Sequence, residues 1–113
     1  MRAYELMIIY VGDTDDAVVS DSLTGVTAAV EAGGGQVATT DLWGKRRFAY
    51  EIDHKWEGIY VVLEITTEAR DLHDIERALR LADEVVRHKV IRLPDAEAAR
   101  RGLLGEATPA QAG

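Results

Sequence analysis

The 113-residue chain contains no cysteine. A disulfide, a thiolate metal ligand and a cysteine nucleophile are therefore excluded. The chain also lacks any run of about 18 apolar residues, the length that a membrane-spanning helix needs. Its first residues, MRAYELMIIYVGD, have no small-residue cleavage site of the kind that ends a signal peptide. These absences predict a cytoplasmic protein. Its 113 residues, 47% of them hydrophobic, predict one small domain with a single core.

Recognisable catalytic and metal-binding motifs are missing as well. The acidic run at residues 13–16 lacks the glycine and the distal glutamate of a calcium loop, and it suits a helix N-terminus instead. The glycines at residues 33–35 follow a predicted helix rather than a strand, unlike a phosphate-binding loop. No nucleophile motif is present, and no pair among His54, His73 and His88 has metal-ligand spacing. We therefore expect no enzyme activity, cofactor, metal or small-molecule substrate.

Basic residues are in the minority, with 13 against 20 acidic residues and a formal net charge of −7. This balance argues against indiscriminate binding to nucleic acid, but a local basic surface is still possible because phosphate contacts are made residue by residue. The segment WGKRRFAYEI at residues 43–52 indicates such a surface. Its consecutive cations and flanking aromatic residues are Lys45, Arg46, Arg47, Trp43, Phe48 and Tyr50.

Hydrophobic periodicity predicts four strands and two helices. Extended or alternating patterns place strands at residues 2–11, 36–53, 58–66 and 85–93. Helical spacing of Val19, Leu23, Val26 and Val30 predicts a first helix, which the glycines at 33–35 end. A second helix, starting around residues 67–71, buries Leu72, Ile75 and Leu79. In the last strand, the alternation places Val86, His88 and Val90 on one side and Arg87, Lys89 and Ile91 on the other.

The element order β-α-β-β-α-β predicts an α+β fold of the ferredoxin-like kind. Short connections and right-handed crossovers give a four-stranded antiparallel sheet with two helices on one face. The first and third strands are central, and the second and third form a long hairpin with a bulge at Gly44. The uncovered face carries Met7, Ile9, Tyr60 and Val62, and an exposed apolar face indicates a partner.

The domain prediction divides the chain after Pro94. Residues 1–94 are expected to form the folded domain, and residues 95–113 a C-terminal extension. A short helical turn is expected within residues 95–104. The end of the extension, at residues 105–113, is rich in Ala, Gly, Pro, Thr and Gln and is expected to be disordered.

Four segments occur in a familiar order and spacing across residues 1–93. They are the opening Met1-Arg2-x-Tyr4-Glu5, the block at residues 43–52, the sequence EGIY at 57–60 and the sequence VVRHKVIR at 85–92. With these segments the chain resembles the family of the sixth small-subunit ribosomal protein of bacteria. The resemblance implies the ferredoxin-like fold and a structural role in the small ribosomal subunit. It also implies binding to the central domain of the small-subunit ribosomal RNA together with the eighteenth small-subunit protein.

The resemblance implies roles for two groups of cations and for nearby aromatic residues. Arginine binds phosphate with a planar fork, and phosphate contacts position a protein on RNA without reading its sequence. The expected RNA-binding residues are Arg2, Lys45, Arg46, Arg47, Arg87, Lys89 and Arg92. Aromatic residues are favoured at protein interfaces. The expected contacts with the partner protein are Trp43, Phe48, Tyr50 and Tyr60.

Plainer explanations stay open for the same cations. Arg46 and Arg47 can be edge-strand charges that discourage sheet-to-sheet aggregation. Arg87 and Lys89 can lie on an exposed strand face and pair with acids of the helices.

Two other classes of protein have the same predicted fold. One is a dimeric small-ligand protein or cofactor-free enzyme, with two sheets packed face to face through the uncovered surface. The other is an RNA-recognition-motif domain. Its Lys/Arg-Gly-aromatic signature is absent from the third strand, where Glu64 would oppose RNA.

Overall fold

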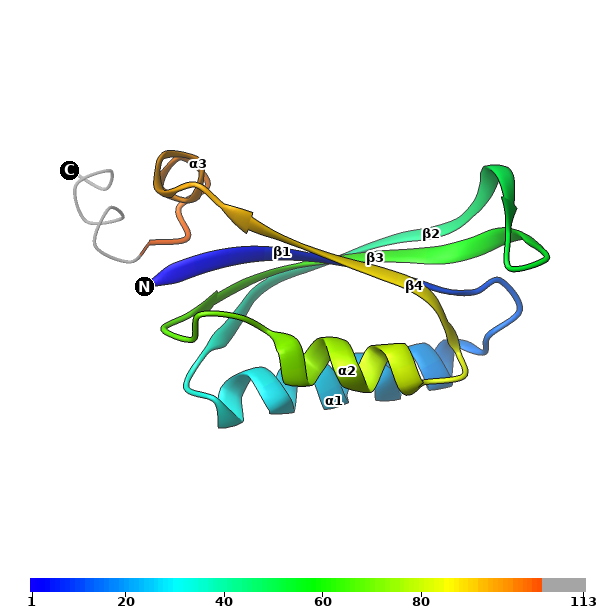
Figure 1. Cartoon of the computed structure of the whole chain (residues 1–113), viewed down its shortest axis with the longest axis horizontal. Helices are drawn as coiled ribbons and strands as arrows, with labels where there is room; N and C mark the ends of the chain where they lie inside the picture. The colour runs from blue at the N-terminus through cyan, green and yellow to red at the C-terminus, as the bar shows by residue number, and fades with distance from the viewer. Residues whose placement is uncertain (105–113) are drawn as a thin grey trace.

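The computed structural model describes residues 1–104 (Figure 1). The predicted disordered end at residues 105–113 lies outside the described residues. Seven elements follow one another within these described residues. They are β1 (Arg2–Val11), α1 (Asp16–Ala32), β2 (Gln36–Ile52), β3 (Lys55–Thr67), α2 (His73–Leu81), β4 (Val85–Leu93) and α3 (Asp95–Arg100).

The four strands form one antiparallel sheet in the order β2-β3-β1-β4. Helices α1 and α2 contact each other, and both lie on one face of this sheet (Figure 1). The predicted ferredoxin-like architecture is thereby confirmed, with β1 and β3 in the centre and β2 and β4 at the edges. None of the helices in residues 1–104 is long and apolar enough to cross a membrane.

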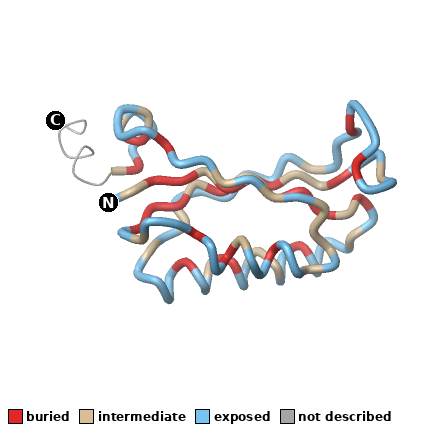
Figure 2. The backbone as a smooth tube through the Cα atoms, viewed as in Figure 1, coloured by how far each residue is buried: buried red, intermediate tan, exposed pale blue. Residues whose placement is uncertain are grey.

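The main core lies between the sheet and the two long helices (Figure 2). Alternation along the central strands points every second side chain of β1 and β3 toward the helices. Each fully buried aliphatic side chain contributes about 1.5–3 kcal/mol. The buried members of this core are Tyr4, Leu6, Ile8, Tyr10, Val61, Leu63 and Ile65 from the sheet, with Val19, Val26, Val30, Leu72, Ile75 and Leu79 from the helical side.

The second helix begins later than the sequence indicates, at His73. Two polar side chains in the predicted starting region, Thr67 and Asp71, accept hydrogen bonds from the backbone. Thr67 Oγ1 accepts the N–H of Ala69, and Asp71 Oδ1 accepts the N–H of His73, each at 3.1 Å. The Thr67 bond forms a local turn that competes with helix formation, whereas the Asp71 bond satisfies a free N–H at the start of α2, so the helix begins at His73.

The hairpin of β2 and β3 closes through a two-residue turn at Asp53 and His54. Both residues have positive φ angles, 49° and 63°, as a type I′ hairpin turn requires. The register of β2 against β3 shifts at three places, and one shift leaves Trp43 as the extra residue before Gly44. Gly44 has φ +84°, so the predicted bulge is confirmed. The tip of the hairpin bends away from the helices (Figure 1).

A second bulge, in β4, corrects one sequence prediction. Tyr10 pairs with Val85 and Ile9 pairs with Arg87, so Val86 has no partner of its own on β1. Val86 packs beside Ile9 on the helix-free face, whereas His88 reaches Glu76 of α2 on the other face. The prediction that Val86 shares a side with His88 and Val90 was wrong, because alternation fails across a bulge.

The C-terminal segment after β4 folds back across the sheet. Helix α3 lies on the face opposite α1 and α2, near the N-terminus (Figure 1). Ala98 and Leu103 are buried there against Ala3 and Leu93. The sequence favoured a helical turn in this segment but gave no indication of where it docks.

Candidate nucleic-acid and partner interface

We call the helix-free side of the sheet the open face. Residues that pair directly across antiparallel strands point to the same side, so the registers arrange this face in rows of four. From β4 to β2, the three central rows are Arg87–Ile9–Tyr60–Gly44, Lys89–Met7–Val62–Asp41 and Ile91–Glu5–Glu64–Thr39.

Both ends of the open face are covered by the chain itself. At one end Phe48 and Ile52 of the bent hairpin pack on Ile9, which is only 4% exposed. At the other end lies α3. Met7, Tyr60 and Val62 in the middle remain partly exposed. The prediction of an apolar open face is therefore correct for its centre, whereas Ile9 is hidden because the hairpin bends over it.

Two of the four predicted partner-binding residues form one exposed surface. Trp43 stacks on Tyr60 with ring centroids 6.2 Å apart and planes 8° apart, and Trp43 is 45% exposed. Its Nε1 donates to Asp41 Oδ2 at 3.0 Å, which fixes the ring. Phe48 meets the edge of Tyr60 but is only 6% exposed, so it supports the surface from within. Tyr50, at 65% exposed, stands apart near the hairpin tip.

The three consecutive cations of the hairpin do not form one patch. Alternation along β2 sends Arg46 to the open face and its neighbours Lys45 and Arg47 to the helix side. Lys45 Nζ lies 3.5 Å from a carboxylate oxygen of Glu57. The Arg46 guanidinium lies 5.9 Å from the ring centre of Trp43, and that of Arg47 lies equally far from Trp56. Both arginines thus make cation–π contacts that leave their hydrogen-bonding capacity largely unused.

The cations of β4 are also divided between the two faces. Arg87 and Lys89 lie on the open face, whereas Arg92 pairs with Tyr4 and shares the helix side with Arg2. Arg2 donates to the carbonyl of Glu68 at 2.8 Å. Within residues 1–104, Arg87, Lys89 and Arg92 make no side-chain hydrogen bond or ion pair. The explanation that pairs Arg87 and Lys89 with helix acids therefore finds no support, since the sheet separates them.

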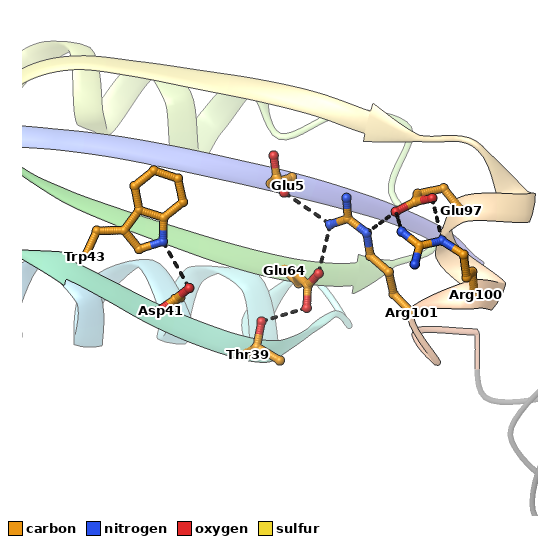
Figure 3. A network of polar contacts seen from close by, with 8 residues as sticks. All are labelled: Glu5, Thr39, Asp41, Trp43, Glu64, Glu97, Arg100 and Arg101. Atoms are coloured by element: carbon orange, nitrogen blue, oxygen red, sulfur yellow. Dashed lines mark hydrogen bonds and ion pairs between the residues drawn. The ribbon is translucent and has the colours of Figure 1, made fainter.

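Sequence reasoning missed a cluster of charges at the α3 end of the open face (Figure 3). Glu5 and Glu64 lie directly opposite each other on β1 and β3. Arg101 Nη1 donates to both, at 3.1 Å to Glu5 Oε2 and 2.9 Å to Glu64 Oε2. Its Nε donates to Glu97 on α3. The available sequence signal was the helical spacing of Glu97 and Arg101, which predicts a local ion pair and not one across 96 residues.

The bonds between Glu97 and the two arginines shift the pKa values of these three groups. Hydrogen bonds from Arg100 and Arg101 lower the pKa of Glu97 to about 2. In turn, the bond to Glu97 is the largest cause that raises the pKa of Arg101. Glu64 has a further partner, because Thr39 Oγ1 donates to its carboxylate at 2.8 Å.

Two grooves lie on the helical side of the sheet. One, of about 810 Å³, runs between α1 and β2, and the other, of about 680 Å³, between α1 and α2. The first is lined largely by apolar and hydroxyl side chains, among them Val19, Leu23, Thr27, Leu42 and Ile59. No group of three or more His, Cys, Asp or Glu residues that could hold a metal ion occurs in residues 1–104.

The architecture defines a ferredoxin-like α+β protein, and solved structures share it. The crystal structure of 30S ribosomal protein S6 from Thermotoga maritima matches with a TM-score of 0.79 and 28% identity, over 88% of this chain and 94% of that one. A chain from the solved complex of the chemotaxis kinase CheA P2 domain with the response regulator CheY, from the same organism, matches with a TM-score of 0.53 and 17% identity, which reflects the fold alone.

Sequence comparison is more specific than the fold. The small ribosomal subunit protein bS6 of Beutenbergia cavernae is 45% identical over 96 residues, covering 85% of this chain and 99% of that protein. Its counterpart in Salinispora arenicola is 44% identical over 92 residues, covering 81% and 96%. The family model described as Ribosomal protein S6 matches residues 3–92. The chain belongs to this family of small-subunit ribosomal proteins, whose members are structural proteins and not enzymes. Helix α3 and Arg101 lie beyond the matched segment.

Proposed function

We propose that this protein binds the central domain of the small-subunit ribosomal RNA together with the eighteenth small-subunit protein, in the cytoplasm. The single observation that carries the proposal is the presence of unpaired cations on the open face. Arg87 and Lys89 stand along its β4 border without an acidic partner in residues 1–104, in the rows that hold Tyr60 and Val62. On a chain of net charge −7, unpaired cations beside an exposed aromatic surface suit a polyanion next to a protein.

RNA contacts of this kind act through phosphate. Each Lys or Arg that meets a phosphate releases condensed counterions, so affinity falls as salt rises. Arg87 and Lys89 form the main border in this proposal, and Arg46 adds a guanidinium at the opposite edge. Arg2 and Arg92 extend the cationic surface around the end of β4. Because phosphate contacts position the protein without reading bases, recognition rests on the shape of the folded RNA.

The partner protein in this proposal occupies the centre of the open face. Trp43 and Tyr60 offer a rigid aromatic surface, and Met7 and Val62 continue it as apolar area. The hairpin tip and α3 both project on this side of the sheet (Figure 1). A narrow segment of the partner fits between these raised ends. Tyr50 on the exposed hairpin tip reaches further from the sheet and is available to the same partner.

The decisive experiment removes the two unpaired cations. We expect Arg87→Ala combined with Lys89→Ala to weaken binding to the RNA–partner complex and to reduce the slope of log affinity against log salt by about 2. The matched control is Arg77→Ala combined with Arg80→Ala, which removes the same charge from exposed positions on α2. Equal losses in the two double variants, measured by filter binding across a salt series, would count against the proposal.

A face-to-face dimer is the alternative from another functional class. The raised ends of the open face oppose it, because two flat sheets cannot pack closely across α3 and the bent hairpin. We expect a monomer in sedimentation-velocity ultracentrifugation at micromolar concentration. A dimer that Trp43→Ser dissociates would favour the alternative.

A further inference from the structure

We propose that Arg101 adjusts the charge of the open face, and that the segment of residues 95–104 is a cap that holds this guanidinium in place. In this proposal the cap offsets part of the negative charge of Glu5 and Glu64, so that RNA phosphates can approach the neighbouring Lys89 and Arg87. The inference rests on the proposed RNA-binding function. It concerns a segment that lies outside the family match at residues 3–92.

The two carboxylates are unfavourable neighbours without a cation. Glu5 and Glu64 are directly opposed on central strands, and like charges in that position destabilise a sheet. Their side chains are 29% and 19% exposed, so water screens them only in part. Left unpaired, they would place two negative charges beside the β4 border of the open face, which the proposal assigns to a polyanion.

The cap is built to deliver one cation to this spot. Ala98 is completely buried, and Leu103 packs with it against the ends of β1 and β4. These apolar contacts fix the backbone on both sides of Arg101. Glu97 accepts a hydrogen bond from Nε of Arg101. This bond leaves Nη1 directed at Glu5 and Glu64, as Figure 3 shows.

The rows of the open face are close enough for the charge of Glu5 and Glu64 to affect RNA binding at the row of Lys89. Residues two apart on a strand are separated by about 6.6 Å, so Glu5 lies one such step from the row of Lys89. The Debye length at physiological salt is about 8 Å. Carboxylates in this row therefore act on phosphates bound at the next row, and Arg101 reduces that repulsion.

The test compares two adjacent arginines that carry the same charge. Arg101→Gln removes the cation that reaches the sheet, whereas Arg100→Gln removes one whose side-chain bonds within residues 1–104 all go to Glu97. We expect Arg101→Gln to weaken RNA–partner binding about five- to tenfold more than Arg100→Gln does, since it exposes two carboxylates near the phosphates. Equal losses in the two variants would overturn the proposal.

A charge rescue tests whether Arg101 acts through its charge or only by anchoring the cap. Adding Glu5→Gln and Glu64→Gln to Arg101→Gln should restore most of the affinity, although the guanidinium is still absent. The control adds Asp21→Asn and Glu31→Gln on α1, which changes the net charge equally at exposed positions on the far side of the sheet. If the control restores as much affinity, or if neither does, the proposal fails.

The outcomes also separate this proposal from the proposed function. Failure of the wild-type chain to bind the RNA–partner complex would remove both. Binding by the wild type with identical behaviour of Arg101→Gln and Arg100→Gln would remove only the role of the cap. Amide hydrogen exchange in the free variants checks the fold, because the β1 and β3 amides should stay protected while those of Ala98 and Leu103 exchange faster in Arg101→Gln.

Discussion

Trp43 and Tyr60 stack on the open face although they belong to different strands and are not paired in register. The bulge before Gly44 makes this possible, because Leu42 pairs with Val61 and Gly44 pairs with Tyr60, leaving Trp43 as an extra residue. The bulge thus turns the Trp43 ring toward the same side as Tyr60. A local irregularity of the backbone creates the aromatic surface that we assign to the partner protein.

The first prediction concerns Gly44, whose φ of +84° is a conformation that other residues adopt at a cost. A Cβ at this position meets no atom within 4 Å, so the effect of Gly44→Ala is conformational and not steric. We expect a loss of about 1–2 kcal/mol in the free energy of unfolding. Urea denaturation measures the loss, and a change in near-ultraviolet circular dichroism should report a displaced Trp43.

The control for Gly44→Ala is the same substitution at Gly25 in the middle of α1. Gly25 also has open space around it, but its backbone is helical. Alanine loses less conformational entropy in a helix, so Gly25→Ala should stabilise the protein by about 0.5–1 kcal/mol. Destabilisation at both positions would contradict the conformational argument.

The second prediction concerns Gly58, where steric crowding determines the effect of a substitution on stability. A Cβ there would lie 2.5 Å from Ile9 Cγ2 and 2.9 Å from the Phe48 ring. Gly58→Ala should therefore cost about 1–3 kcal/mol through overpacking. We also expect the hairpin tip to lift from Ile9, which amide exchange at Phe48 would detect. Unchanged stability with an unchanged exchange rate would show that Ile9 and Phe48 do not pack tightly around Gly58 in solution.

The regular part of this fold could be predicted from the sequence, because it depends on periodicity alone. Alternation along β1 and β3 and the helical spacing of Val19, Val26 and Val30 indicate which side chains face one another. The same logic failed at Val86 and at Ile9. One bulge changes the side to which a residue points, and one bend covers a position that alternation leaves exposed.

The candidate site was harder to predict than the fold, for a related reason. The sequence places Lys45, Arg46 and Arg47 together, but a strand sends consecutive residues to opposite faces. Among the predicted cations, Arg46, Arg87 and Lys89 share the open face. Arg101 lies 96 residues from Glu5, and no local pattern encodes a contact at that separation.

The third prediction tests whether Arg46 and Arg47 act on RNA or only guard an edge strand. Strand β2 is an edge of the sheet, so charges on it can oppose aggregation. We expect Arg46→Ala combined with Arg47→Ala to weaken association with the RNA–partner complex while the domain stays folded by circular dichroism. Aggregation on standing together with normal RNA association would support the edge-guard explanation instead.

The fourth prediction uses the pKa of Glu97, which hydrogen bonds from Arg100 and Arg101 lower from 4.5 to about 2. A carboxyl group with a lowered pKa in the folded state stabilises that state above its unfolded value, and the contribution disappears as the pH falls through the folded value. The contribution of Glu97 to the docking of α3 should therefore be complete and independent of pH above about pH 4.5, and it should fall away between pH 4.5 and 2.

The side-chain carboxyl ¹³C shift of Glu97 measures this titration directly. Its midpoint should lie near 2 in the wild type and move toward 4.5 when Arg100→Gln and Arg101→Gln are combined. A wild-type midpoint near 4.5 would show that the two guanidinium groups do not hold Glu97 in solution.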